Sequence, residues 1–255
     1  MLENKELRRK LKIPVVEMFS AIQGEGTTMG QPQFFIRVAG CNLRCLGNCD
    51  TQYSWDIKED YYITIEEIRK TIEDSGIKNI CLTGGEPALY AKELIVLMHS
   101  LPEAYKLILQ TNGTIYDGEL FNSCFLVAMD MKSPSFGGGS DSSIIEKLSA
   151  GGSFDPLYEI KVVILTDADI DFAIEISKLT ARRNIPLVLQ SGNPTCKTVD
   201  YNIRHGYKKD RNNSLNAYKE LVKKVFDRKM EFMNFSLIRI LPQMHVLMYG
   251  NERGR

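Results

Sequence analysis

The amino-acid sequence predicts an α/β protein with a parallel sheet, and two observations support this fold class. Short, continuous runs rich in Val, Ile, Leu and Phe recur along the 255 residues, as in strands that are covered on both faces. Helical patterns separate most of these runs, and such alternation forms parallel sheets that are either barrel-like or doubly wound. The expected strands are residues 34–39, 79–83, 106–110, 125–131, 158–165, 186–190 and 235–241.

The helices between these strands carry start and stop signals. Thr64 and Glu67 are spaced as a capping box, and Gly76 is placed to end the same helix. The other expected helices are residues 89–101, 169–183 and 214–229, the last with Ser214 as its N-cap. The stretch 191–213 is expected to be a long loop.

Composition and charge narrow the class of protein. Apolar residues make up 44% of the chain, enough for a substantial core, and we expect a single domain over residues 1–255. The formal net charge of +0 argues for neither a nucleic-acid partner nor an anionic membrane. The first 12 residues lack the apolar core of a signal peptide, and no apolar run approaches the roughly 20 residues that span a bilayer. Cys81, Cys124 and Cys196 are scattered singly, which favours free thiols and a cytoplasmic protein.

Three cysteines in a short polar stretch are the strongest chemical signal. They are Cys41, Cys45 and Cys49, on the loop that leaves the first expected strand. Three thiolates are one ligand short of the usual four around zinc or an iron–sulfur cluster. A three-cysteine [4Fe–4S] cluster leaves one iron open to a substrate or cofactor. A zinc site is the alternative, but it needs a fourth ligand, and His99, His205 and His245 have no local ligand spacing.

Polar and glycine-rich segments follow the later strands. Gly84-Gly85-Glu86-Pro87 follows the second strand and Thr111-Asn112-Gly113 follows the third. The fourth strand runs into residues 130–135, and the sixth into 190–193. In a barrel these segments meet the cysteine loop at the carboxyl-end mouth, where active sites lie. Taken alone, the Gly-Gly-Glu-Pro segment is also compatible with an ordinary strand-to-helix turn.

The cysteine loop and the Gly-Gly-Glu-Pro segment together resemble the radical S-adenosylmethionine superfamily. Further motifs, spread over nearly the whole chain, are similar to the 7-carboxy-7-deazaguanine synthase family of queuosine biosynthesis. They are residues 19–26, 35–42, 49–51, 53–55, 241–247 and 250–254. One feature departs from the superfamily pattern: three residues, not two, separate Cys45 from Cys49, and Asn48 stands where an aromatic residue is usual.

The resemblance implies an incomplete parallel (β/α)6-type barrel with the cluster loop at its C-terminal mouth. Residues 13–33 would form an N-terminal substrate-binding segment, and residues 214–255 a C-terminal segment that packs on the barrel. The implied enzyme is a carbon–nitrogen lyase that converts 6-carboxy-5,6,7,8-tetrahydropterin to 7-carboxy-7-deazaguanine and ammonia. The implied cofactors are a [4Fe–4S] cluster, S-adenosylmethionine and Mg²⁺. The implied partners are an electron donor such as flavodoxin or ferredoxin and a second copy of the chain. The alternatives are another radical enzyme, such as a glycyl-radical activase, and a non-catalytic zinc-binding module.

The resemblance also implies roles for individual residues. Arg37 would bind the substrate carboxylate, a task that suits its planar fork, although a cation in an apolar strand could instead pair with Asp or Glu. Thr51 would bind Mg²⁺, unless it is an ordinary turn residue, and His245 would lie near the site or in the core. Glu86 would hold the cofactor's ammonium group. The other implied substrate-binding residues are Ile22, Gln23, Gly24 and Thr83. The implied cofactor-binding residues are Asn48, Asp50, Gly85, Glu86, Ser133, Pro134, Ser135 and Gln190.

Overall fold

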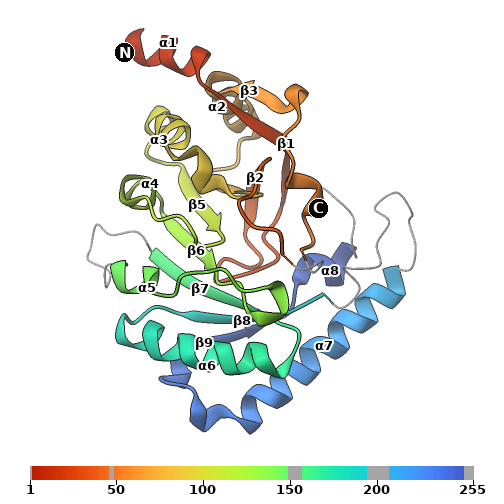
Figure 1. Ribbon diagram of the computed structural model, residues 1–255. Helices are drawn as coiled ribbons and strands as arrows, with labels where there is room; N and C mark the ends of the chain where they lie inside the picture. Colours follow the sequence, from red (N-terminus) through yellow and green to blue (C-terminus); the bar gives the residue numbers. More distant parts are fainter. Residues whose placement is uncertain (1, 46–48, 149–156, 194–206, 250–255) are drawn as a thin grey trace.

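The computed structural model describes residues 2–45, 49–148, 157–193 and 207–249, and its strands form one nine-stranded sheet (Figure 1). The strand order is β3-β1-β2-β4-β5-β6-β7-β8-β9, and every neighbouring pair from β2 to β9 is parallel. The parallel strands are β2 (Pro32–Val38), β4 (Asn79–Gly84), β5 (Lys106–Thr111), β6 (Leu126–Asp130), β7 (Leu157–Ile164), β8 (Leu187–Ser191) and β9 (Ile238–Leu241). Each overlaps one of the expected strands, so the parallel α/β class is confirmed.

Two antiparallel strands extend the sheet at one edge. β1 (Lys12–Ile22) pairs with β2, and β3 (Tyr62–Thr64) pairs with β1. β3 and β9 are the two ends of the strand order, so the sheet is open rather than closed into a barrel. An open sheet agrees with the expected incomplete barrel, but the six-unit size is not confirmed, because the sheet contains seven parallel strands and two antiparallel ones.

Most of the helices in the described part of the chain lie on the outer side of the curved sheet, whereas α8 (Met244–Tyr249) lies at the inner face (Figure 1). The other helices are α1 (Leu2–Lys10), α2 (Ile65–Ser75), α3 (Ala91–Ser100), α4 (Gly118–Asn122), α5 (Ile144–Lys147), α6 (Asp167–Arg182) and α7 (Tyr207–Asp227). The capping box of α2 is confirmed: Thr64 Oγ1 accepts from the Glu67 amide at 3.2 Å, and Gly76 ends the helix with φ of 68°. Within the described residues, no helix is long and apolar enough to cross a membrane.

The prediction that Ser214 caps a helix is wrong. α7 begins at Tyr207, so Ser214 lies inside the helix, where its side chain is completely buried. The first described side chains of this stretch, Arg211 and Asn212, are exposed, and polar residues of this kind are compatible with a helical turn. Residues 194–206 of the expected loop lie outside the described part of the chain.

Alternation along the strands separates a packed face from a polar one. Ile36, Leu82 and Leu109 are buried in the large apolar core that also takes in the outer helices. Their neighbours Arg37, Thr83 and Gln110 point to the other side, where Arg37 pairs in register with Thr83 and Thr83 Oγ1 donates to Gln110 Oε1 at 3.0 Å. The inner face of the sheet is therefore lined by polar side chains next to the cysteine loop.

Candidate active site

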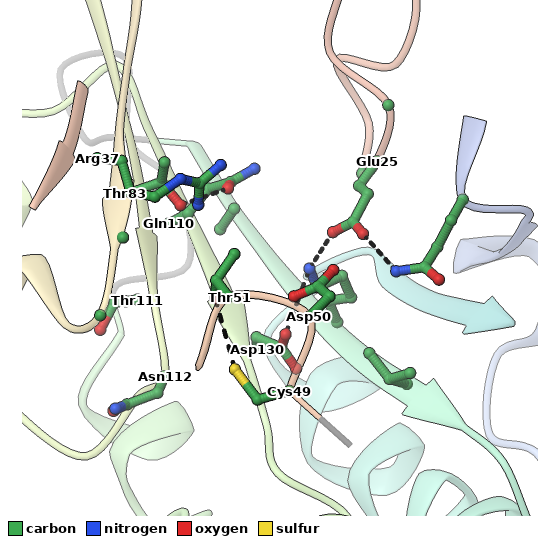
Figure 2. Close-up of a pocket in the computed structure, with 18 of the residues that line it drawn as sticks. Glu25, Arg37, Cys49, Asp50, Thr51, Thr83, Gln110, Thr111, Asn112 and Asp130 are labelled. Atoms are coloured by element: carbon green, nitrogen blue, oxygen red, sulfur yellow. Dashed lines mark hydrogen bonds and ion pairs between the residues drawn. The ribbon is translucent and has the colours of Figure 1, made fainter. Parts of the chain in front are cut away.

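A cavity lies against the inner face of the sheet at the carboxyl ends of the parallel strands (Figure 2). Alternate residues of neighbouring strands line it, including Arg37 and Thr83, and on β6 and β7 the residues Ala128, Asp130 and Lys161. The loop after β1, the cysteine loop and the segment around α8 supply the rest of the lining. The cavity is where the topology brings together the motifs that follow the strands.

All three cysteine thiols of the loop line this cavity. Cys45 is 7% exposed and packs with Phe136 and Val163. The Leu43 amide donates to Cys41 Sγ at 3.4 Å. Burial raises the pKa of the Cys45 thiol to about 11, although the nearby Lys132 ammonium opposes this rise. The thiol is therefore protonated at neutral pH, and a positively charged metal group would displace that proton on binding.

The donor set fits an iron–sulfur cluster better than structural zinc. Cys81 and Cys124 are buried away from the loop. Among the described residues, the side chains grouped closely enough to bind a single ion are Glu25, Asp50 and His245, and the three loop thiols are not in this group. Structural zinc takes four protein ligands. Three thiols on one loop match a [4Fe–4S] cluster with one iron left open.

Two glycines allow the end of β4 to approach the backbone that leads into the cysteine loop. A Cβ on Gly84 would lie 2.2 Å from the carbonyl oxygen of Val38, and one on Gly85 would lie 2.0 Å from that of Gly40. Gly84 also has φ of +133°, which L side chains rarely adopt. The packing of the loops that form the cavity therefore requires glycine at both positions, independently of any contact with a cofactor.

Glu86 joins two of these loops. Its carboxylate accepts hydrogen bonds from the Ala88 amide at 2.9 Å, the Thr111 hydroxyl at 2.7 Å and the Asn112 amide at 2.7 Å. The side chain is fully buried and does not line the cavity, and burial raises its pKa despite these donors. The structure therefore gives Glu86 a clear role in holding the loops together, and contact with a cofactor remains a prediction.

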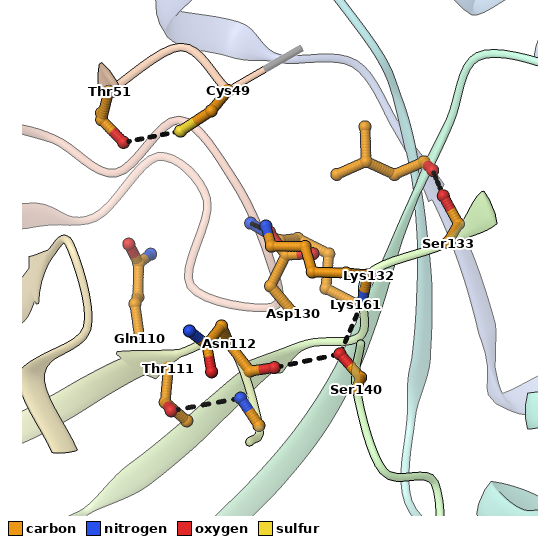
Figure 3. A network of polar contacts seen from close by, with 12 residues as sticks. Cys49, Thr51, Gln110, Thr111, Asn112, Asp130, Lys132, Ser133, Ser140 and Lys161 are labelled. Carbon is orange, nitrogen blue, oxygen red and sulfur yellow. Dashed lines mark hydrogen bonds and ion pairs between the residues drawn. The ribbon is translucent and has the colours of Figure 1, made fainter. Parts of the chain in front are cut away.

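Buried charges connect the N-terminal loop with the sheet. The Lys161 ammonium pairs with the Glu25 carboxylate. It also lies 3.3 Å from Asp130 Oδ2, which Lys132 approaches at 3.0 Å (Figure 3). Gln243, just before α8, donates to Glu25 Oε1 at 3.0 Å. Opposite charges alternate along the network, so its members compensate one another's loss of hydration.

The structure brings together most of the predicted site residues. Those that line the cavity are Ile22, Gln23, Gly24, Arg37, Cys41, Cys45, Cys49, Asp50, Thr51, Thr83 and Gly85, with His245 beside them. Ser133, Pro134, Ser135 and Gln190 do not line it: Ser133 Oγ donates to the Val163 carbonyl at 3.0 Å, and Gln190 is fully buried. Asn48 and Cys196 lie outside the described residues.

Lys161 and Asp130 were not predicted as site residues. A signal for Lys161 was present, because a cation inside an apolar run is the feature that identified Arg37. The sequence around Gln243 contains no comparable signal. Its position beside Glu25 depends on how the C-terminal segment packs against the N-terminal loop.

Comparisons with known proteins show an iron–sulfur cluster domain and a family. Residues 22–129 match the family model described as a 4Fe-4S single cluster domain. The chain is 33% identical to a 7-carboxy-7-deazaguanine synthase of Bacillus subtilis (strain 168), a match that covers 95% of this chain and 98% of that protein. It is 27% identical to the protein of that name from Thermoplasma acidophilum, over 94% and 99% of the two chains.

A solved structure shares the fold. The crystal structure of QueE from Escherichia coli superimposes with a TM-score of 0.63 over 89% of this chain and 95% of that chain, at 22% sequence identity. At that identity the likeness establishes the fold, whereas the Bacillus subtilis match extends over nearly the full length of both proteins. This chain therefore belongs to the 7-carboxy-7-deazaguanine synthase family.

Proposed function

We propose that the protein converts 6-carboxy-5,6,7,8-tetrahydropterin to 7-carboxy-7-deazaguanine and ammonia. One observation above all supports this reaction: the three thiols and the Arg37 guanidinium line the same cavity. A group that holds a redox cofactor and a cation that recognises a carboxylate therefore face a shared space. The cluster that the three thiols would hold would supply, when bound and reduced, the electron for reductive cleavage of S-adenosylmethionine and so the radical chemistry that the pterin substrate needs.

The side chains of the protein bind and orient the reactants. Cys41, Cys45 and Cys49 hold the cluster, and Arg37 binds the pterin carboxylate through paired N–H donors. The Phe19 and Phe35 rings stack on each other with centroids 5.1 Å apart, and both line the cavity. They offer the heterocycle an apolar wall that excludes water.

A magnesium ion completes the proposed site. Thr51 and Asp50 both line the cavity, directly after the third cysteine. Magnesium takes few protein ligands and fills its octahedral shell with water and substrate oxygens. We assign the Thr51 hydroxyl as its protein ligand, with the pterin carboxylate as a further ligand.

The remaining partners follow from the same proposal. A one-electron donor such as flavodoxin or ferredoxin reduces the cluster, and the working form is a homodimer. The enzyme is cytoplasmic, and the free thiols of Cys81 and Cys124 suit such a reducing compartment.

The decisive experiment is anaerobic turnover of the reconstituted protein with the carboxypterin, S-adenosylmethionine and a reductant, followed by mass spectrometry. The proposal predicts iron and sulfide in the protein and 7-carboxy-7-deazaguanine among the products. Cleavage of S-adenosylmethionine without conversion of the pterin would favour another radical enzyme, such as an activase. Zinc in place of iron would favour the binding module.

A further inference from the structure

Arg37 is anchored by a partner that lies outside the cavity. Its Nε donates to Glu17 Oε1 at 2.7 Å, and the two side chains are 14% and 21% exposed. Within the described residues, Glu17 is the acidic side chain that forms an ion pair with Arg37. Arg37 lines the cavity beside Thr83 and Gln110 (Figure 2), whereas Glu17 does not line it.

A β-bulge places Glu17 opposite Arg37. In the antiparallel pairing of β1 with β2, Val15 faces Val38, and the next paired residue is Glu17, which faces Arg37. The register shifts between these pairs, so Val16 is the extra residue. In a regular ladder Val16 would face Arg37, and the carboxylate would point to the other side of the sheet. Bulges next to active sites commonly re-aim a side chain in this way.

Tyr53 reinforces the same contact from the segment that follows the cysteine loop. Its hydroxyl donates to Glu17 Oε1 at 2.8 Å, so that one carboxylate oxygen accepts from both Tyr53 and Arg37. The Tyr53 and Phe19 ring centroids lie 5.8 Å and 6.0 Å from Arg37 Cζ, within the range of a cation–π interaction.

These contacts restrict how the guanidinium can turn. Its inner nitrogen, Nε, is held by Glu17, and its carbon lies close to two rings. Within the described part of the chain, the hydrogen bond of Arg37 is made by Nε, which leaves the two terminal nitrogens as donors for a ligand in the cavity. An anchored planar fork loses less conformational entropy on binding a carboxylate than a freely rotating one does.

We propose that Glu17 and Tyr53 are positioning residues that hold the Arg37 guanidinium ready for a two-pronged contact with the substrate carboxylate. This inference rests on the proposed function, because carboxylate binding by Arg37 is part of it. It adds two residues that influence substrate specificity without lining the cavity themselves. The bulge in β1 is what places Glu17 next to Arg37.

The test measures equilibrium binding of the carboxypterin to the reconstituted holoenzyme with S-adenosylmethionine and no reductant. Glu17→Ala should weaken pterin binding roughly 2- to 10-fold, the range for the cost of ordering one flexible side chain on binding. Tyr53→Phe keeps the ring and should weaken binding a few-fold. In an Arg37→Ala background neither change should weaken binding further, because residues that act through a shared partner are not additive. Affinity for S-adenosylmethionine should stay unchanged throughout.

The chain provides a matched control. Arg8 Nε and Glu66 Oε2 are also 2.7 Å apart, with side chains 14% and 21% exposed, and neither residue lines the cavity. Glu66→Ala should therefore leave pterin binding unchanged. Wild-type pterin affinity in Glu17→Ala, or an equal loss with and without Arg37, would overturn the inference. If Glu17→Ala does not fold, Tyr53→Phe decides by the same criteria. Wild-type affinity in Arg37→Ala would instead show that the proposed carboxylate contact is wrong.

Discussion

The Lys161 ammonium on β7 forms an ion pair with the Glu25 carboxylate, 136 positions earlier in the chain. The two side chains are 12% and 14% exposed. Gln243 hydrogen-bonds to the same carboxylate from the C-terminal side. The pair therefore fastens the N-terminal loop and the segment before α8 to the sheet, and all three residues line the cavity.

This ion pair predicts a loss of stability in acid. Burial alone would raise the pKa of the Glu25 carboxyl, but the charges of Lys161 and His245 have a larger, opposite effect. The pKa therefore falls from 4.5 to about 2. Because the folded pKa lies below the unfolded one, the stabilisation is complete above pH 4.5 and is lost as the pH falls towards 2. Glu25→Gln should lower the free energy of unfolding at neutral pH by an amount on the order of 3 kcal/mol.

The measurement is urea denaturation of both proteins at pH values from neutral down to about pH 3. The lowest of these values lie in the range over which the carboxyl titrates. The difference in free energy of unfolding between wild type and Glu25→Gln should shrink in acid. Glu175→Gln is the control, because Glu175 pairs with Lys178 on the surface, where ion pairs contribute little. A difference that stays constant with pH would contradict the assignment.

The cysteines should divide into two groups. Cys41→Ala, Cys45→Ala and Cys49→Ala should each lose the cluster and the activity, because each removes one of the three proposed ligands, all of which line the cavity. Cys81→Ala and Cys124→Ala should keep iron and sulfide at wild-type levels. Both of these thiols are buried, so their loss should cost roughly 1–2 kcal/mol of stability through packing. Iron analysis and thermal unfolding separate the two groups, and a fully loaded variant in the first group would refute its ligand.

Gly24→Ala should loosen the C-terminal segment. A Cβ at Gly24 would lie 2.6 Å from His245 Nδ1 and 2.8 Å from the His245 amide nitrogen, and Gly24 O accepts from the Met244 amide at 3.0 Å. The added methyl should therefore push α8 away, with a cost of about 1–3 kcal/mol for overpacking. Limited proteolysis near the C-terminus should accelerate. Gly118→Ala, whose Cβ would meet nothing nearer than 3.5 Å, should leave the cleavage rate unchanged.

The sequence predicted the parallel strands more completely than the edge of the sheet. Strands such as β4 and β5 are covered on both faces, so their continuous apolar runs are visible without a partner. β1 was missed because Pro14, Glu17 and Ser20 interrupt its apolar residues, and only part of the strand is buried. β3 has three residues, too few for a periodic signal.

The candidate site was predictable where its chemistry is local in sequence. The cysteine loop and the Gly-Gly-Glu-Pro segment are contiguous motifs, and both reach the cavity wall or support it. Tyr53 belongs to one of the family motifs, but no role was predicted for it or for Glu17, because their roles depend on a one-residue bulge and on a contact between segments 36 positions apart. A register shift of this kind changes which side chain faces the site, and the pattern of residues in the sequence does not predict such a shift.

Magnesium dependence is the last prediction, and it tests Thr51. The Thr51 hydroxyl lines the cavity and lies 3.5 Å from Cys49 Sγ, so a bound ion would sit close to the cluster loop. Thr51→Ala should raise the magnesium concentration needed for half-maximal activity without abolishing turnover, because water can replace one ligand in the hydrated shell. The pterin carboxylate, as a second ligand, should make metal and substrate bind cooperatively. Titrations of magnesium with and without carboxypterin measure both effects. Identical curves for wild type and Thr51→Ala would exclude Thr51 as a ligand and make Asp50 the next residue to test.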